Sequence, residues 1–188
     1  MIKKINYYLD KYFGIEIIRS RPKESIKFAH KYFKKKKLIA IEIGVLKGQN
    51  SEDILKNLNI KKIYLVDPYI KYEKYKKDGN YGKLIQAEKE AKTRLRKYPG
   101  KIEWIKDFSE KAIKKINEYV DFIYIDGNHE YEYVKKDLEL YWKKLNKKGI
   151  IAGHDIQCEG VSKALLEFSE KKKLKVFFGD RRDWWIIK

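Results

Sequence analysis

Residues 121–156 read DFIYIDGNHEYEYVKKDLELYWKKLNKKGIIAGHDI, and their pattern is the most informative about the fold of this chain. It opens with an apolar run, DFIYID, continues with helical spacing over residues 133–145, and returns to a second apolar run, GIIAG. Short apolar runs on either side of an amphipathic segment are typical of a strand, a helix and a parallel strand. Each run ends in polar residues, namely Asp126 and His129 after the first and His154 and Asp155 after the second.

These polar residues are expected to meet at one edge of a sheet. The carboxyl ends of neighbouring parallel strands share a crevice, and α/β proteins bind their ligands there. Two carboxylates and two of the chain's three histidines would then lie together. Such a set of side chains suits a metal site or a proton-transfer site.

The alternation of strands and helices extends in both directions from this stretch. Upstream, apolar runs at residues 38–43, 62–67 and 102–105 alternate with segments of helical spacing. Downstream, a helix is expected over residues 161–172, and then LKVFF and WWIIK form two strands around the turn at residues 179–182. That connection is too short for a parallel crossover, so the last strand must be antiparallel. The sequence therefore predicts an α/β fold with a doubly wound, mostly parallel sheet of seven strands.

The domain organisation follows from the same pattern. One domain is expected over residues 38–188, preceded by a helical extension at residues 1–37 that packs on it. The extension should contain two amphipathic helices, because proline at Pro22 disfavours helix in the residue before it. Within the domain, additional helices are expected at residues 83–97 and 110–118.

Two groups of aromatic residues leave questions open. A tyrosine-rich loop begins at Tyr69, and it either closes over a ligand or packs on itself. Trp184 and Trp185 are adjacent in the last strand, so they are expected to alternate between core and surface.

Composition excludes several classes of protein. The 188 residues are 43% hydrophobic, which is typical of a globular chain, and no stretch reaches the roughly 18 apolar residues of a membrane span. Cys158 is the only cysteine, which excludes an internal disulfide and a cysteine-rich zinc site. The N-terminus lacks the pattern of a secretory signal. We therefore expect a soluble, cytoplasmic enzyme or binding domain, with a homo-oligomer as an open alternative.

The net charge of +18 admits an anionic partner without requiring one. Only six of the 45 basic residues are arginine, the side chain that most often reads phosphate and guanine. The lysines are spread over nearly every predicted helix. Solvated lysine faces are therefore favoured over a dedicated nucleic-acid surface.

A glycine-containing loop follows the first strand, in the sequence IEIGVLKGQNS. Gly44 and Gly48 allow the backbone to turn sharply and to approach a ligand closely. The second strand ends at Asp67, and an acidic residue at that place can bond both hydroxyls of a ribose. The spacing differs from the dinucleotide fingerprint G-x-G-x-x-G, which disfavours a nicotinamide cofactor. A different nucleoside cofactor is therefore expected.

With these residues, the chain resembles the class I S-adenosylmethionine-dependent methyltransferases, which have a Rossmann-like sheet with an antiparallel last strand. It is most similar to the small-molecule O-methyltransferase branch, whose signature is D-G-x-H-x-Y…D-L…G-G-x-I-x-G-H-D. The matching residues are E-x-G-x-x-x-G from Glu42, the acid Asp67, and DGNHEYEYVKKDLELYWKKLNKKGIIAGHD. Lys148 stands where the family often has the first of two glycines. The resemblance covers residue 38 to the C-terminus.

The resemblance implies S-adenosyl-L-methionine as cofactor and assigns its contacts residue by residue. The methionine part would lie against the loop after the first strand, the ribose against the acid of the second, and the adenine beside the end of the third. The implied cofactor-binding residues are Glu42, Gly44, Gly48, Asn50, Asp67, Asp107, Phe108 and Asp126.

The resemblance also implies roles for the polar clusters. Asp126, His154 and Asp155 occupy the positions that bind a divalent cation in metal-dependent relatives, for which Mg²⁺ or Mn²⁺ is the expected ion. The histidine replaces an expected oxygen ligand, which favours a softer metal or no metal. His129 is the candidate general base and, with Asp126, makes up the predicted catalytic pair, because an imidazole titrates near neutrality.

The predicted activity is therefore methyl transfer to a hydroxyl of a small molecule such as a sugar or a phenolic metabolite. One alternative places the methyl group on RNA, in keeping with the positive charge. A second alternative is a non-catalytic module that retains the cofactor-binding fold.

Overall fold

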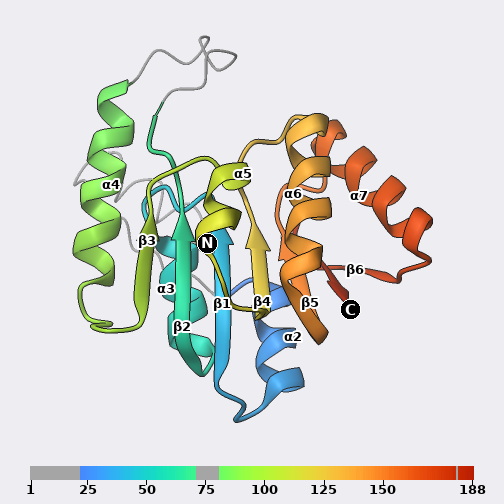
Figure 1. Ribbon diagram of the computed structural model, residues 1–188, viewed down its shortest axis with the longest axis horizontal. Helices are drawn as coiled ribbons and strands as arrows, with labels where there is room; N and C mark the ends of the chain where they lie inside the picture. The colour runs from blue at the N-terminus through green and yellow to red at the C-terminus, as the bar shows by residue number, and fades with distance from the viewer. Residues whose placement is uncertain (1–21, 71–80, 181) are drawn as a thin grey trace, which may run out of the picture.

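The computed structural model describes residues 22–70, 81–180 and 182–188 of the chain, in which strands and helices alternate (Figure 1). The strands are β1 (Leu38–Ile43), β2 (Ile60–Val66), β3 (Ile102–Ile105), β4 (Val120–Ile125), β5 (Leu145–Gly153), β6 (Val176–Phe178) and β7 (Trp184–Ile187). The helices are α2 (Glu24–Phe33), α3 (Gln49–Asn57), α4 (Tyr81–Leu95), α5 (Ser109–Ala112), the 3-10 helix η2 (Ile113–Lys115), α6 (Tyr131–Lys144) and α7 (Glu159–Lys172).

The strands of these ranges form one sheet in the order β3-β2-β1-β4-β5-β7-β6. The five strands from β1 to β5 pair in parallel, and β7 runs antiparallel between β5 and β6. Figure 1 shows the arrowheads of β1, β2 and β4 pointing to the same edge of the sheet. The predicted fold class, a Rossmann-like doubly wound sheet with an antiparallel last strand, is confirmed.

Each face of the sheet is covered by helices. α2, α3 and α4 pack on one face, to which Phe122 and Tyr124 of β4 contribute. η2, α5, α6 and α7 pack on the other face, which receives the alternating residues Ile123 and Ile125. Because both faces are buried, the central strands are apolar at successive positions, which is the pattern that made them recognisable in the sequence.

The burial on both faces also corrects the expectation for the tryptophans. Trp184 is 0% exposed and Trp185 is 7% exposed, although their side chains point to opposite faces of β7. Alternation along the strand is present, but neither face of the sheet is solvent. Trp185 packs with Phe28 of α2 at a ring-centroid distance of 5.3 Å, and Trp184 lies among residues of the second layer.

One predicted helix is shorter in the structure, and two other predicted segments lie wholly or mostly outside the described residues. The helix predicted at residues 110–118 is shorter, because α5 and η2 end at Lys115 and Ile116 turns into extended backbone with its side chain fully buried. The first predicted N-terminal helix and most of the tyrosine-rich loop lie outside the described residues. Tyr69 itself is buried, and its hydroxyl donates a 3.1 Å hydrogen bond to the carbonyl of Leu46. No helix among the described residues is long and apolar enough to cross a membrane.

A buried carboxyl group on α6 fixes the start of α5. Asp137 is 4% exposed and accepts a hydrogen bond from Ser109, whose carbonyl in turn accepts a 2.9 Å bond from the Tyr141 hydroxyl. Burial raises the pKa of Asp137 to about 7, despite the opposing effect of the Ser109 hydrogen bond. The loop from β3 to α5, which carries the two predicted adenine contacts Asp107 and Phe108, is therefore held in place by hydrogen bonds with α6.

The raised pKa of Asp137 predicts a specific pH dependence of stability. In the unfolded chain an aspartate titrates near pH 3.9, so between about pH 4 and 7 the unfolded state loses a proton that the folded state keeps. Stability from this group is therefore greatest at low pH and is lost as pH rises toward 7. We expect the free energy of unfolding of the wild type, relative to Asp137→Asn, to fall by about 2 kcal/mol between pH 5 and pH 7.

Urea unfolding at the two pH values measures this difference. Glu139→Gln is the matched control, because Glu139 is exposed on the same helix, and it should keep the pH dependence of the wild type. The same pH dependence in the wild type and in Asp137→Asn would contradict the prediction.

Candidate functional site

The predicted site residues all lie at or near the carboxyl edge of the parallel strands. The parallel pairing of β1 with β2 and β4 sets Glu42 level with Leu65 and Tyr124, and that of β4 with β5 sets Ile125 level with Gly153. The loops after these strands consequently open on one side of the sheet. Three residues of these loops have positive φ without being glycine, namely Leu46, Tyr69 and Asp155. Strained backbone of this kind concentrates at functional sites.

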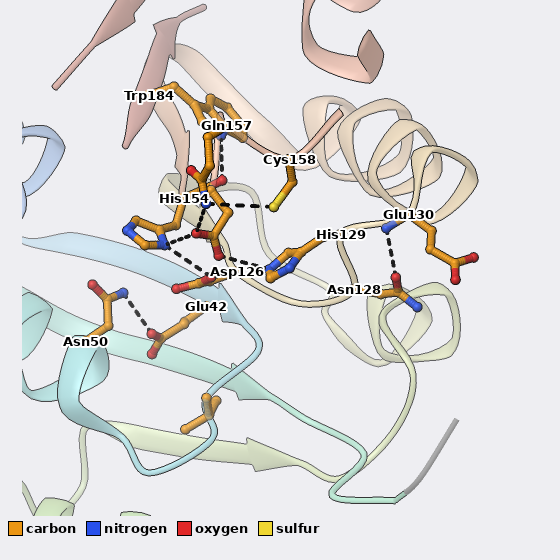
Figure 2. Close-up of polar contacts among 12 residues, drawn as sticks. Glu42, Asn50, Asp126, Asn128, His129, Glu130, His154, Gln157, Cys158 and Trp184 are labelled. Carbon is orange, nitrogen blue, oxygen red and sulfur yellow. Dashed lines mark hydrogen bonds and ion pairs between the residues drawn. The ribbon is translucent and has the colours of Figure 1, made fainter. Parts of the chain in front are cut away.

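At the end of β1, Glu42 is fully buried beneath the site. Asn50 Nδ2 donates a 2.8 Å hydrogen bond to Glu42 Oε1, and the Ser51 hydroxyl donates to Oε2. Burial raises the pKa of Glu42 to about 7, while these two hydrogen bonds oppose the rise. Figure 2 shows Asn50 turned toward Glu42. The Oδ1 atom of Asn50 is buried and has no hydrogen-bond partner.

Gly44 brings the end of β1 into contact with the end of β4. Its φ is +85°, and a Cβ built on it would lie 2.0 Å from the carbonyl oxygen of Asp126. Gly48, with φ of +73°, is the residue before α3, and a Cβ built on it would lie 3.2–3.3 Å from Leu95 and Ala91 of α4, slightly closer than ordinary van der Waals contact. The two glycines therefore have different reasons to be glycine: one permits a close approach at the site, the other mainly a turn.

Asp67, after β2, organises the glycine-containing loop. Its Oδ2 accepts 2.9 Å hydrogen bonds from the amides of Val45 and Leu46, and its Oδ1 accepts a 2.8 Å bond from the amide of Tyr69. A carboxylate offers about four acceptor positions, so about one remains for a ligand.

Asp107 and Phe108 follow β3, the outer strand of this half of the sheet. Lys115 lies 2.9 Å from the Asp107 carboxylate, and its hydrogen bond lowers the pKa of that group. These residues follow the strand that β2 and β1 separate from β4 in the sheet.

The polar cluster combines the ends of β4 and β5, with Asp126 at its centre. Figure 2 shows His129 and His154 on either side of the Asp126 carboxylate, and their nearest nitrogens lie 3.8 and 3.9 Å from its Oδ1. Asp155 is closer to both histidines, at 3.2 Å from His129 Nε2 and 3.1 Å from His154 Nδ1. Two carboxylates and two imidazoles are thus within one small volume.

The electrostatics of the cluster favour its charged forms. Burial alone would raise the pKa of Asp126, but His129 and Lys23 outweigh it, and the pKa ends below its usual value. The interaction with Asp126 raises the pKa of His129 against the effect of burial, and the charge of Asp155 adds to the rise. Asp155 is the nearer of the two carboxylates to His129 Nε2, at 3.2 Å against 3.8 Å for Asp126. Because both carboxylates are negatively charged and close to the ring, both stabilise the protonated form of His129.

The geometry also permits a cation. One ligand atom each from Asp126, His154 and Asp155 lie within 4.8 Å of one another, and all three side chains are partly buried. Two carboxylate oxygens and one imidazole nitrogen form a mixed donor set of the kind that accepts Mn²⁺.

Three contributors to the site were missed by the sequence analysis. Gln157 donates a 2.8 Å hydrogen bond to Asp155, and Asn128 accepts one of 2.8 Å from the amide of Glu130. Both residues lie within or beside the signature, so their position in the sequence could have marked them as candidates for the site. Lys23 has no such position: it precedes β4 by about a hundred residues, yet its Nζ lies 3.1 Å from Asp126 Oδ2.

Comparison with known proteins defines the class. A family model described as "Methyltransferase domain" matches residues 41–156, which include the ends of β1, β2, β3, β4 and β5. The chain belongs to this methyltransferase family and has the Rossmann-like fold of S-adenosylmethionine-dependent methyltransferases.

Individual relatives are distant. The uncharacterized protein R132 of Acanthamoeba polyphaga mimivirus is 29% identical over 133 residues, which cover 66% of this chain. The chain spans about half the length of that relative, because the match covers 54% of it.

Among solved structures, a caffeoyl-CoA O-methyltransferase candidate from Staphylococcus aureus superposes with a TM-score of 0.65 at 15% identity, over 98% of this chain and 91% of that one. A methyltransferase candidate from Streptococcus mutans, solved in complex with SAH, gives a TM-score of 0.63 at 16% identity, over 91% and 99%. rRNA methylases are also among the structures with this fold. At these identities the likeness shows the fold alone.

Proposed function

We propose that this protein transfers the methyl group of S-adenosylmethionine to a hydroxyl oxygen of a small molecule. The observation that carries the proposal is the imidazole of His129, which lies between the carboxylates of Asp126 and Asp155 at the edge where the glycine-containing loop also opens. This arrangement offers a base for a hydroxyl proton beside a cradle for a nucleoside cofactor.

The residues of the β1 and β2 loops fit the cofactor. Because Gly44 has no side chain, only backbone atoms lie where the loop after β1 passes Asp126. The buried and unpartnered Oδ1 of Asn50 can accept a hydrogen bond from an ammonium group. Its Nδ2 already donates a hydrogen bond to Glu42, so Asn50 suits the amino group of the methionine part better than the carboxylate of that part. The remaining acceptor position of Asp67 suits a ribose hydroxyl.

The chain's own residues can manage the proton of the reaction. S-adenosylmethionine, when bound, supplies a methyl carbon that is activated by its attachment to a positively charged sulfur. That carbon would pass to the acceptor oxygen as the carbon–sulfur bond breaks and S-adenosylhomocysteine leaves. His129 would take the hydroxyl proton at Nδ1, the ring nitrogen opposite the Nε2 that faces the carboxylates. Asp126 and Asp155 stabilise the resulting imidazolium, much as a carboxylate does in a catalytic triad.

A divalent cation is compatible with this scheme. Asp126, His154 and Asp155 would hold it, and when bound it would lower the pKa of a hydroxyl group nearby. His129 remains available as the base because it is not one of these three ligands.

Calorimetry with S-adenosylmethionine tests the cofactor part of the proposal. We expect Asp67→Ala to weaken binding by about tenfold or more, since it removes both an acceptor and the anchor of the Val45–Leu46 amides. Asp180→Ala, at an exposed turn between β6 and β7, is the matched control and should bind like the wild type. Absence of binding by the wild type would rule out methyl transfer to any acceptor.

A second candidate, methyl transfer to RNA, is favoured by one observation. The groove between α6 and α7 has a volume of about 360 Å³, and its charged lining side chains are four lysines and two glutamates, namely Lys135, Lys143, Lys171, Lys172, Glu139 and Glu167. With the net charge of +18, this groove could follow a phosphate backbone. RNA binding that persists near physiological salt and falls steeply as salt is raised would favour this candidate. Cofactor binding without turnover on any hydroxyl acceptor or RNA would instead favour a non-catalytic module.

A further inference from the structure

Lys23 brings a positive charge from the start of α2 into the polar cluster. It occupies the residue before α2, where a serine, threonine, aspartate or asparagine would ordinarily cap the helix. Its side chain makes no capping bond. Instead its Nζ lies 3.1 Å from Asp126 Oδ2 and 4.5 Å from the centre of the Tyr124 ring. The ammonium group is therefore held by the acid and by the aromatic face together.

The backbone around Lys23 is fixed from several directions. The amide of Ser25 donates a 2.8 Å hydrogen bond to the buried carboxylate of Asp183, at the start of the last strand. Ile26 and Ala29 of α2 are fully buried against the sheet. The ammonium position is thus set by tertiary packing and not only by the flexible lysine side chain, 17% of which is exposed.

The position of Lys23 has consequences for the charge of the proposed cation site. Asp126 and Asp155 are the two carboxylates of the candidate ligand set, and together they would balance one divalent ion. The ammonium of Lys23 already neutralises one of them at Oδ2, while Oδ1 faces His129 and His154. A divalent ion at Oδ1 would lie close to a like charge in a partly buried setting, where repulsion is weakly screened.

We propose that Lys23 is a tethered cation of the acceptor site, which competes with a divalent metal ion for Asp126. The inference rests on the proposed function, because it concerns the cation site assigned there. In the absence of metal, the Lys23 ammonium supplies the positive charge beside Asp126. Metal binding then requires the ammonium to withdraw from Oδ2 or to tolerate the ion beside it.

Mn²⁺ binding, measured by electron paramagnetic resonance of the free ion and by calorimetry, tests this competition. We expect Lys23→Met to bind Mn²⁺ about tenfold more tightly than the wild type, or better, because it removes the like charge. Lys23→Gln, a second neutral variant, should show the same gain. Lys23→Arg should keep the weak affinity of the wild type. Lys27→Met is the matched control on α2, since Lys27 pairs with Glu24, and it should also leave the affinity unchanged.

Unchanged or weaker Mn²⁺ affinity in the two neutral variants would overturn the proposal. Absence of Mn²⁺ binding by every variant would overturn it as well, together with the cation site. S-adenosylmethionine binding by the wild type is measured separately without metal. A failure of the Lys23 inference is therefore distinguishable from a failure of the methyltransferase assignment.

Discussion

Replacing His129 with glutamine is expected to lower the kcat of methyl transfer by about 10²–10⁴-fold, the usual contribution of a general base. The imidazole of His129 lies between the two carboxylates of the cluster, at 3.2 Å from Asp155 and 3.8 Å from Asp126, and, unlike His154, it is not one of the proposed cation ligands. Glutamine keeps a polar side chain of similar length but cannot take a proton at neutral pH. Because His129 makes none of the proposed cofactor contacts, the affinity for S-adenosylmethionine should stay within a few-fold of the wild type.

The measurement is the release of S-adenosylhomocysteine, with the best acceptor from a panel of phenolic and sugar hydroxyl compounds. His30→Gln is the matched control, because His30 lies on α2 with its Nδ1 2.6 Å from the carbonyl of Asn57, away from the cluster. A glutamine variant of His129 with full turnover would remove the base assignment and leave the deprotonation to another group.

The Gly44→Ala substitution should have the largest effect on the folded state. A Cβ at this position would lie 2.0 Å from the carbonyl oxygen of Asp126 and 2.8 Å from the amide nitrogen of Gly127, both of which are backbone atoms. The ends of β1 and β4 would have to separate, in addition to the cost of placing an alanine at φ of +85°. We expect a loss of about 3 kcal/mol in the free energy of unfolding, and loss of S-adenosylmethionine binding.

Gly100→Ala separates the two causes. Gly100 also has a positive φ, of +72°, but a Cβ there would meet nothing within 4 Å. Its replacement should therefore cost only the conformational part, about 1 kcal/mol, and leave cofactor binding intact. Urea unfolding of both variants gives the comparison. Equal losses for the two glycines would show that the contact between the strand ends is not tight.

Much of the fold was predictable because both faces of the central strands are buried. The runs at β1, β2, β4 and β5 are apolar at successive positions. A glycine or an acid follows β1, β2 and β4, and β5 ends in Gly153. The short connection between β6 and β7 required antiparallel pairing, which the structure confirms. The expectation of a helix at residues 110–118 was wrong in extent, because the burial of Ile116 draws the chain out of the helix after Lys115.

Part of the candidate site was also visible in the sequence. Parallel pairing requires that the residues after β4 and β5 share an edge, so Asp126, His129, His154 and Asp155 had to be neighbours once those strands were recognised. A strand pattern does not show which polar side-chain atoms of the site lack a hydrogen-bond partner in the folded protein. The unpartnered Oδ1 of Asn50 follows from the bond between its Nδ2 and Glu42, which depends on the fold.

The order of strands and helices along the chain, the antiparallel last strand and the edge where the polar residues gather could all be read from the sequence, because these features depend on hydrophobic period and loop length. The burial of both Trp184 and Trp185 depends on which helices cover each face of the sheet, so it is visible only in the folded protein. The same is true of the contact between Lys23 and Asp126. A contact between residues about a hundred positions apart depends on how α2 packs against the sheet, and that packing leaves no local pattern around Lys23.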